Sequence, residues 1–216
     1  MEGRELIVNR AARFLRDGDL VNLGIGMPTQ VANHIPEGIE IQLQSENGFI
    51  GIGPTPSAEE WDHDVVNAGG QPASILPSGC TFDSCMSFGL IRGGHVDATV
   101  LGALEVDQEG NLANWIIPGK KVPGMGGGMD LVAGANMVIV TMEHCDKKGN
   151  PKILKKCTLP LTAAHEVDYI ITELCVLHVT PEGLVLEELA PGVTAEEVQA
   201  KTGADLIIPE HVGCMV

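Results

Sequence analysis

The sequence predicts an α/β protein built on a single open sheet, mostly parallel or mixed, with flanking helices. Three observations support this class. Apolar residues in segment 7–15 recur at helical spacing, residues 39–44 alternate between apolar and polar as a strand does, and residues 136–142 are dominated by apolar side chains. The last pattern is typical of a strand buried on both faces of a sheet.

The first half of the chain predicts its elements in a clear order. Residues 17–19 end the first helix, a short strand covers 20–23, and Pro28 suits the first turn of a helix that ends near Pro36. The strand of 39–44 follows. Residues 47–60 then contain five turn-forming Gly and Pro residues, so we expect a long irregular loop, which in a compact domain is usually functional.

The second half continues the alternation of strand and helix. Asp83 is a good N-cap, and Thr194 with Glu197 forms a capping box that opens the last helix. The predicted elements are a strand near 73–76, a helix at 84–91, paired strands at 97–106 and 111–117, a short helix after the glycine run 124–128, and strands at 136–142, 169–174, 175–179 and 184–189. No repeat or shift in composition divides the chain, so we expect one domain, residues 1–216.

Composition and charge exclude several classes of protein. Hydrophobic residues make up 44 % of the 216 residues and charged residues 19 %, which argues against disorder. The net charge of −16 would repel a phosphate backbone, so we expect no nucleic-acid partner. No apolar run has the length of a membrane span, and the acidic N-terminus lacks the apolar core of a signal peptide. These features predict a cytoplasmic protein that does not bind membranes.

Cysteine and histidine spacing favours neither disulfides nor a metal site. The six cysteines include no Cys-x-x-Cys pair and predict reduced, mostly buried thiols. The seven histidines match none of the spacings used to bind zinc, so no metal is expected.

Glu46 stands at the most informative point of the chain. It follows the strand of 39–44 and precedes glycines 48, 51 and 53, and open α/β sheets bind ligands outside the carboxyl ends of their strands. A carboxylate there is well placed to act as a nucleophile. The alternative is an exposed glutamate beside an ordinary Asn-Gly turn.

The glycine-rich segments do not match nucleotide-binding fingerprints. Segments 24–29 and 51–56 lack the third glycine of the dinucleotide motif, and no Gly-Lys-Ser/Thr sequence occurs. The run 124–128 can instead gather backbone amides around an anion, as an oxyanion hole does, or simply form a tight strand-to-helix turn. Lysines 147, 148, 152, 155 and 156 form the main basic cluster, with Lys120 and Lys121 as a second. The main cluster suits an anionic ligand or a solvated hairpin.

Five motifs in this order resemble the β subunit of 3-oxoacid CoA-transferases. They are Asn-Leu-Gly-Ile-Gly-Met-Pro-Thr at 22–29, Gln-Ser-Glu-Asn-Gly-Phe-Ile-Gly-Ile-Gly at 44–53, Asn-Ala-Gly-Gly-Gln at 67–71, Pro-Gly-Lys at 118–120 and Pro-Gly-Met-Gly-Gly-Gly-Met-Asp-Leu at 123–131. The resemblance extends from the first helix to about Thr202. Several motifs in one order are far more specific than any single one.

The resemblance implies roles for individual residues. Glu46 would attack an acyl-CoA and become a glutamyl-CoA thioester, and the amide of Gly127 would stabilise the tetrahedral oxyanion. Asn22 would help to hold the thioester or carboxylate, although an asparagine can also satisfy a backbone group at a strand end. Asn47 would orient Glu46 or serve the turn. The resemblance also places Gly26, Gly126 and Gly128 at the substrate.

The chemistry explains the choice of a carboxylate. Glutamate has a pKa near ~4.3, so it is ionised at neutral pH and needs no general base. Its attack on an acyl-CoA gives an anhydride, the released CoA thiolate returns to the glutamyl carbonyl, and an incoming acid reverses these steps. We therefore expect ping-pong transfer of CoA among short-chain acids such as acetoacetate, acetate or butyrate, with CoA as substrate and no permanently bound cofactor.

The resemblance also implies a fold and a partner. The family shares its fold with certain sugar-phosphate isomerases, so the alternative function is a sugar-phosphate isomerase or an effector-binding sensor. A scaffold subunit without activity is disfavoured because Ser-Glu-Asn-Gly is intact. The matched motifs cover one half of the catalytic unit, which predicts an α subunit as partner in an α2β2 or larger assembly.

Overall fold

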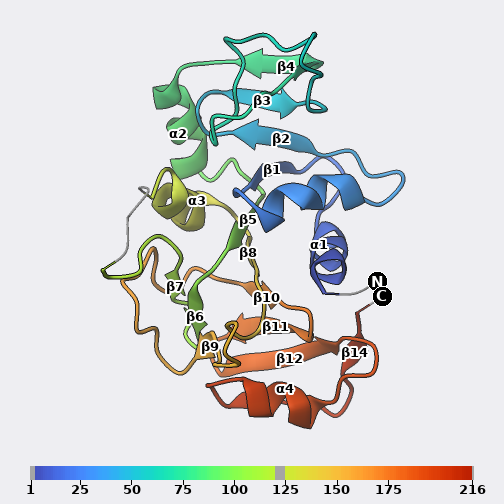
Figure 1. Ribbon diagram of the computed structural model, residues 1–216, viewed down its shortest axis with the longest axis vertical. Helices are drawn as coiled ribbons and strands as arrows, with labels where there is room; N and C mark the ends of the chain where they lie inside the picture. Colours follow the sequence, from blue (N-terminus) through green and yellow to red (C-terminus); the bar gives the residue numbers. More distant parts are fainter. Residues whose placement is uncertain (1–2, 120–124, 216) are drawn as a thin grey trace.

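One large sheet runs along the whole molecule (Figure 1). The structure is a computed structural model that describes residues 3–119 and 125–215. The sheet has 11 strands in the order β13-β12-β11-β10-β8-β5-β1-β2-β3-β4, and β14 pairs with β12. Its strands are β1 (Leu20–Leu23), β2 (Gln42–Ser45), β3 (Phe49–Ile52), β4 (Ile75–Thr81), β5 (Ala98–Gly102), β8 (Val138–Thr141), β10 (Tyr169–Ile171), β11 (Cys175–Thr180), β12 (Gly183–Leu189), β13 (Leu206–Ile207) and β14 (Gly213–Cys214).

The middle of the sheet is parallel and is flanked by antiparallel strands, and β13 and β14 at one end pair parallel with β12. Strands β2, β1, β5, β8 and β10 are parallel neighbours, whereas β3 and β4 on one side and β11 and β12 on the other pair antiparallel. This confirms the predicted α/β class with a mixed sheet. Because the five central strands are parallel, all their carboxyl ends lie on one edge.

Helices cover both faces of the central strands. Helix α1 (Arg4–Ala12) and the 3-10 helix η1 (Met27–His34) lie on one face, and α2 (Ser84–Arg92) and α3 (Gly128–Gly134) lie on the other (Figure 1). Alternate residues of a strand therefore enter different cores. Ile139 packs in the cluster that contains α1, while Val138 and Val140 pack in the cluster on the opposite side. The apolar run of 136–142 follows from burial on both faces.

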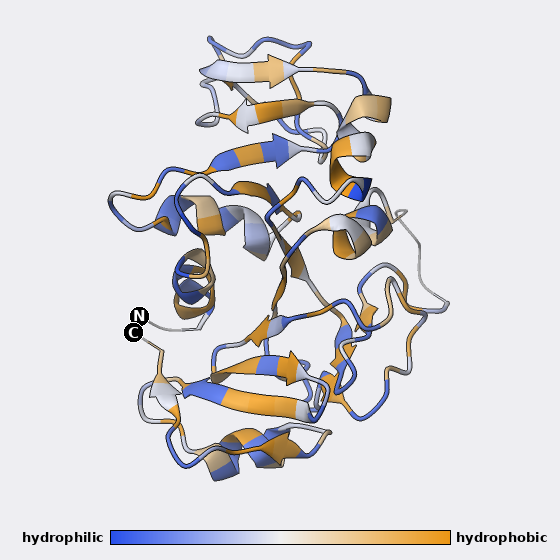
Figure 2. Ribbon diagram, turned by 180° about the vertical axis from the view of Figure 1, so that it is seen from behind, coloured by the Kyte–Doolittle hydropathy of each residue, from blue (hydrophilic) through white to orange (hydrophobic). Residues whose placement is uncertain are grey.

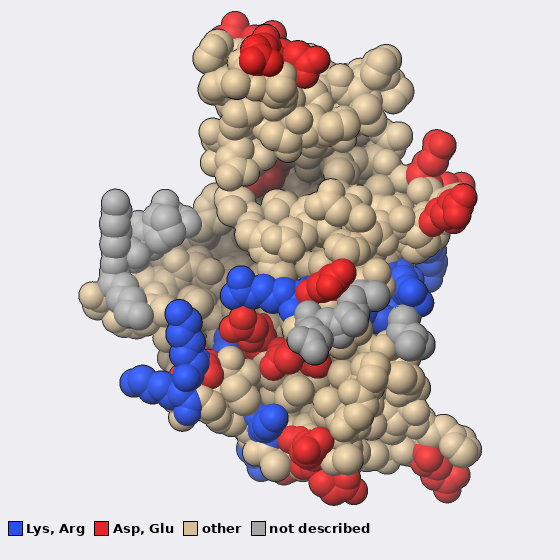
Figure 3. Space-filling view, turned by 45° about the vertical axis from the view of Figure 1, so that its right-hand side comes forward, with Lys and Arg blue, Asp and Glu red and all other residues tan. Residues whose placement is uncertain are grey.

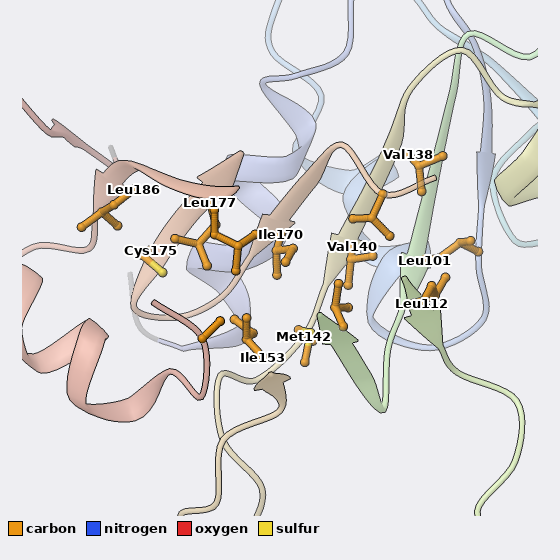
Figure 4. Close-up of a cluster of buried hydrophobic side chains, with 14 of the residues drawn as sticks. Leu101, Leu112, Val138, Val140, Met142, Ile153, Ile170, Cys175, Leu177 and Leu186 are labelled. Carbon is orange, nitrogen blue, oxygen red and sulfur yellow. The ribbon is translucent and has the colours of Figure 1, made fainter. Parts of the chain in front are cut away.

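The cluster that contains Val138 and Val140 extends through the half of the molecule that lies below β8 in Figure 1, here called the lower half. Strands β8, β10 and β11 contribute Val140, Ile170 and Leu177, and Ile153 enters from the small sheet (Figure 4). That second sheet has three strands in the order β7 (Leu112–Ala113), β6 (Glu105–Asp107) and β9 (Ile153–Leu154). Helix α4 (Ala195–Lys201) closes this end through Val198. Figure 2 shows apolar residues along the central strands and polar residues in the outer loops.

Three predictions about the fold were wrong. Residues 47–60 are not one irregular loop, because Phe49–Ile52 forms β3, in which Gly51 allows the ladder to shift register against β4. The strand predicted at 39–44 begins at Gln42, where its partner β1 begins at Leu20. The strands predicted to pair at 97–106 and 111–117 were too long, because Ala98–Gly102 belongs to the large sheet and only β6 and β7 pair, in the small second sheet. Its strands are two or three residues long, too short to give a periodic signal.

The capping predictions were right. The side chain of Asp83 accepts a hydrogen bond from Met86 N at the start of α2, and Thr194 with Glu197 forms the capping box of α4. Cysteine burial was predicted wrongly. All six thiols are free, but only Cys175 is buried, and Cys80, Cys85 and Cys214 are exposed. None of the helices in the described part of the chain combines the length and apolarity needed to cross a bilayer.

A fully buried histidine links three elements of the lower half. His144, just after β8, lies 3.0 Å from Thr172 Oγ1 through Nδ1 and 2.9 Å from Thr202 Oγ1 through Nε2. Thr202 donates its hydroxyl hydrogen to Val198 O, so it accepts from His144 Nε2–H, and Nδ1 accepts from Thr172. Burial, with smaller contributions from Lys201 and Lys152, lowers the pKa of His144 to about 4.

This histidine should make the fold sensitive to acid. The unfolded chain binds a proton at His144 below its ordinary pKa of 6.5, whereas the folded chain does so only near 4, so stability falls as the pH drops between these values. By pH 5, which is 1.5 units below the ordinary value of 6.5, the expected loss is about 2 kcal/mol. Urea unfolding at pH 7.5 and 5 should show a shallower acid decline for His144→Gln. His211→Gln, at an exposed histidine, serves as the control, and an unchanged decline in His144→Gln would contradict this assignment.

Candidate active site

Glu46 lies in a tight turn at the carboxyl edge of the central strands. Ser45 O accepts a hydrogen bond from Gly48 N at 3.0 Å, so Glu46 and Asn47 are the central residues of a β-turn between β2 and β3. Gly48 has φ 137°, and a Cβ atom there would collide with the carbonyl oxygen of Phe82. The half-buried carboxylate is therefore held by a rigid hairpin.

Asn22 on the neighbouring strand contacts this carboxylate. The parallel pairing of β1 with β2 sets Asn22 beside Gln44. Asn22 Nδ2 donates to Glu46 Oε2 at 3.2 Å, and the Asn22 side chain is 1 % exposed. The two residues are 24 positions apart in the sequence, and the register of two strands brings them together. The predicted proximity of Asn22 and Glu46 is present in the structure.

The glycine run approaches Glu46 from the other side. Gly127 is buried and forms the N-cap of α3. A Cβ atom added to it would lie 3.3 Å from Glu46 Cγ and 3.1 Å from Phe88 Cζ. Only a residue without a side chain fits between these groups without displacing one of them. The backbone of Gly127 and the carboxylate of Glu46 thus belong to one site.

Other predicted residues lie farther from the carboxylate. Asn47 is exposed, and its Nδ2 donates to Val66 O at 2.8 Å, so it anchors the segment 66–71 and does not hold Glu46. Gly26 and Gly126 are exposed with positive φ values of 94° and 54°, and Gly128 begins α3. Gly124, Lys120 and Lys121 lie outside the described residues.

The segment 66–71 folds against the turn that carries Glu46. Ser45 Oγ accepts from Ala68 N at 2.9 Å, which adds a second tie to that of Asn47. Asn67 Oδ1 accepts from Gly69 N and Gln71 N, so this segment is itself a compact turn. Ile25, which is 74 % exposed, would be 3.4 Å from a Cβ atom at Gly69. The motifs 22–29, 44–53 and 67–71 therefore meet in space.

Two residues behind Asn22 were not identified from the sequence. Gln44 is 2 % exposed and Ser87 is fully buried, and they hydrogen-bond to each other beside Asn22. The alternation of 39–44 suggested that Gln44 belongs to a polar face. In a parallel strand both faces are covered, so a glutamine within such a strand could have indicated a buried polar contact.

A hollow of about 220 Å³ opens on the same edge of the sheet. It lies beyond the carboxyl ends of β1, β5 and β8, and its lining includes Ile25, Met27, Gly102, Thr141, Glu143 and Lys152. Lys152 Nζ donates to Glu143 O at 3.1 Å, and burial lowers the pKa of this lysine. The hollow therefore extends from Ile25, near the Glu46 turn, to the first lysine after the hairpin 147–151.

Positive charge is absent from the sequence around Glu46. Residues 17–91 contain ten Asp and Glu residues and no Lys or Arg. On the face shown in Figure 3, only acidic charges mark the upper lobe, while Lys and Arg gather across the middle. An anionic ligand that reaches Glu46 must be held by cations from outside this segment.

Comparison with known proteins fits this geometry. Residues 4–201 match the coenzyme A transferase family. The chain belongs to this family. It is 59 % identical over 210 residues to the acetate CoA-transferase subunit beta of Haemophilus influenzae, which covers 97 % of this chain and 94 % of that protein. It is 58 % identical over 204 residues to the subunit of that name from Escherichia coli, with 94 % and 93 % covered.

The fold agrees with the sequence. An acyl-CoA transferase apoenzyme from Escherichia coli O157:H7 superimposes with a TM-score of 0.78 at 23 % identity. The match covers 99 % of this chain and 43 % of that chain, so the present chain spans less than half of the longer protein. The prediction of a CoA-transferase of the β-subunit type is confirmed. Family membership decides against the isomerase or sensor that shares only the architecture.

Gly127 provides a test of the close approach to Glu46. A valine there would displace either the Glu46 side chain or the start of α3, because its Cβ would already be within 3.3 Å of both Glu46 Cγ and Phe88. For Gly127→Val we expect kcat for CoA transfer to fall by roughly tenfold or more, with a smaller change in KM. Steady-state kinetics of the assembled enzyme would measure both constants.

Gly89→Ala is the matched control, because a Cβ atom on that glycine of α2 meets open space. It should keep wild-type kcat. If Gly127→Val changed KM alone, the glycine run would be a turn without a role in the transition state.

Proposed function

We propose that this chain is the catalytic subunit of a transferase that moves CoA between short-chain acids through a covalent intermediate on Glu46. Acetoacetate, acetate and butyrate are the proposed acids. One observation supports the proposal most directly: the Glu46 carboxylate accepts a hydrogen bond from Asn22 Nδ2 at 3.2 Å, and the Cγ atom of the same side chain lies beside Gly127, 3.3 Å from where a Cβ atom would be. Acyl transfer to a carboxylate requires an anionic nucleophile and hydrogen-bond donors close to it, and a side-chain amide and a close-packed glycine backbone can supply the donors.

The proposed steps need no base and no metal. One oxygen of Glu46 attacks the thioester carbonyl, the tetrahedral oxyanion collapses, and the C–S bond breaks to give an anhydride and CoA thiolate. The thiolate attacks the glutamyl carbonyl and releases the first acid, which leaves CoA bound to Glu46 as a thioester. A second acid reverses this order. An amide at Gly127 is the proposed oxyanion donor, and Asn22 holds the carboxylate between steps.

The charge distribution supports separate sites for the two ends of CoA. The thiol must reach Glu46 in the turn after β2, where the nearby sequence offers no cation. The hairpin 147–151, which carries Lys147 and Lys148, follows β8 on the same edge of the sheet. Strand β8 is three strands away from β2, a lateral distance of about 14 Å. The hollow between Ile25 and Lys152 connects these two regions. We propose that the phosphates of CoA lie toward the lysines.

The same distribution supports a second subunit. The relatives of nearly equal length are named as beta subunits, and the longer transferase is more than twice as long as this chain. Ile25 and Met86, which are 74 % and 59 % exposed, leave apolar surface close to the site. We propose that an α subunit covers this edge, excludes water from the anhydride and supplies positive charge. An α2β2 or larger assembly is the expected form.

The covalent intermediate can be trapped. Incubation of the assembled enzyme with acetoacetyl-CoA should attach CoA to Glu46 in a form that hydroxylamine cleaves, as measured by intact mass and peptide mapping. Glu46→Gln should remove both the label and the transfer activity, because an amide oxygen is a poor nucleophile at neutral pH.

The melting temperature of Glu46→Gln should change by only a few degrees, since the amide keeps the shape of the half-buried side chain. Glu37→Gln, which alters an exposed glutamate before β2, is the matched control and should be labelled normally. A label on a cysteine or serine would contradict the proposed mechanism.

The requirement for a partner is tested by reconstitution. The purified chain should transfer no CoA from acetoacetyl-CoA to acetate and should gain activity when the α subunit is added, because one chain leaves Glu46 open to water and short of cations. Light scattering should show the new complex as activity appears. Full activity in the isolated chain would rule out the shared active site.

A further inference from the structure

Three buried polar side chains form a row behind Glu46. Gln44 Nε2 donates to Ser87 Oγ at 3.2 Å, and Asn22 Nδ2 donates to Gln44 Oε1 at 3.3 Å and to Glu46 Oε2 at 3.2 Å. Asn22, Gln44 and Ser87 are 1 %, 2 % and 0 % exposed. The row links helix α2 to the catalytic turn through strands β2 and β1.

The chemistry of these contacts fixes the orientation of each amide. Asn22 Nδ2 faces three acceptors, namely Glu46 Oε2, Gln44 Oε1 and the Gln44 carbonyl oxygen at 3.4 Å. If the Asn22 amide were reversed, its oxygen would face all three of these acceptors. With Gln44 Oε1 turned toward Asn22, Gln44 Nε2 must point to Ser87. This orientation has a cost, because none of the described residues donates a hydrogen bond to the buried Asn22 Oδ1.

We infer that Gln44 and Ser87 are positioning residues that act through Asn22 to keep its Nδ2 directed at the Glu46 carboxylate. Burying polar groups in a row is costly unless they are hydrogen-bonded, and apolar residues would fill the same space at a lower cost. What apolar residues could not do is fix which end of the Asn22 amide meets the nucleophile. The inference rests on the proposed role of Glu46.

A double-mutant cycle tests whether Gln44 acts through Asn22. Gln44→Met keeps an unbranched side chain of similar length but removes both hydrogen bonds. We expect it to slow the attachment of CoA to Glu46 by roughly 10- to 100-fold, with KM changed less than about threefold. In an Asn22→Ala background the same substitution should cost less than about twofold, because the residue through which Gln44 acts is gone.

Ser87→Ala provides a second, gentler probe, since it removes one hydroxyl and leaves Gln44 in place. Its effect should be smaller than that of Gln44→Met and should also disappear in the Asn22→Ala background. If Gln44→Met does not fold, the cycle of Ser87→Ala with Asn22→Ala decides whether the row acts through Asn22. Gln42→Met, two residues earlier on β2, and Ser84→Ala, on the exposed first turn of α2, are the matched controls and should keep the wild-type rate.

Failure of the positioning role of Gln44 and Ser87 can be distinguished from failure of Glu46 as the proposed nucleophile. If wild type is labelled on Glu46 and the Gln44 and Asn22 losses multiply in full, the role of Gln44 is structural and the inference is overturned. A wild-type rate in both Gln44→Met and Ser87→Ala would overturn it as well. If wild type carries no CoA on Glu46, the proposed nucleophile fails, and the same cycle read from overall CoA transfer still tests the coupling of Gln44 to Asn22.

Discussion

The parallel pairing of β1 with β2 is the constraint on which the rest of the site depends. Its register places Asn22 beside Gln44, and the turn that follows β2 then places Glu46 within 3.2 Å of Asn22 Nδ2. A slip of one residue in either strand would put Asn22 and Gln44 on opposite faces of the sheet and separate Asn22 from Glu46. The register is stabilised by the apolar clusters on both faces of the central strands, so the accuracy of the site derives from the packing of the core.

Close backbone approach is the second constraint. The turn needs Gly48 because the chain there has φ 137° and passes the Phe82 carbonyl, and a Cβ atom at Gly127 would press on Glu46 Cγ and Phe88 at the start of α3. These glycines are far apart in sequence but border the same few ångströms. They allow two backbone segments to meet one carboxylate, which side chains of any size would prevent.

Electrostatics separates the chemistry from the binding of the anionic ligand. Glu46, the proposed nucleophile, lies in a segment of 75 residues without a single Lys or Arg, whereas Lys147 and Lys148 follow β8, three strands away in the sheet. The ligand must therefore be held from a distance, by the lysines of this chain and by a partner.

The sequence by itself determined the fold class, the helix caps at Asp83 and Thr194 and the family, because these depend on local patterns and on residues in a fixed order. Only the tertiary structure decided which groups meet Glu46. Asn22, Gly127 and Ser87 come from three separate elements, and their meeting depends on strand register and helix packing that no local pattern records. For the same reason the sequence left open whether Asn47 orients Glu46 or serves the turn, and tertiary contacts direct its amide to Val66.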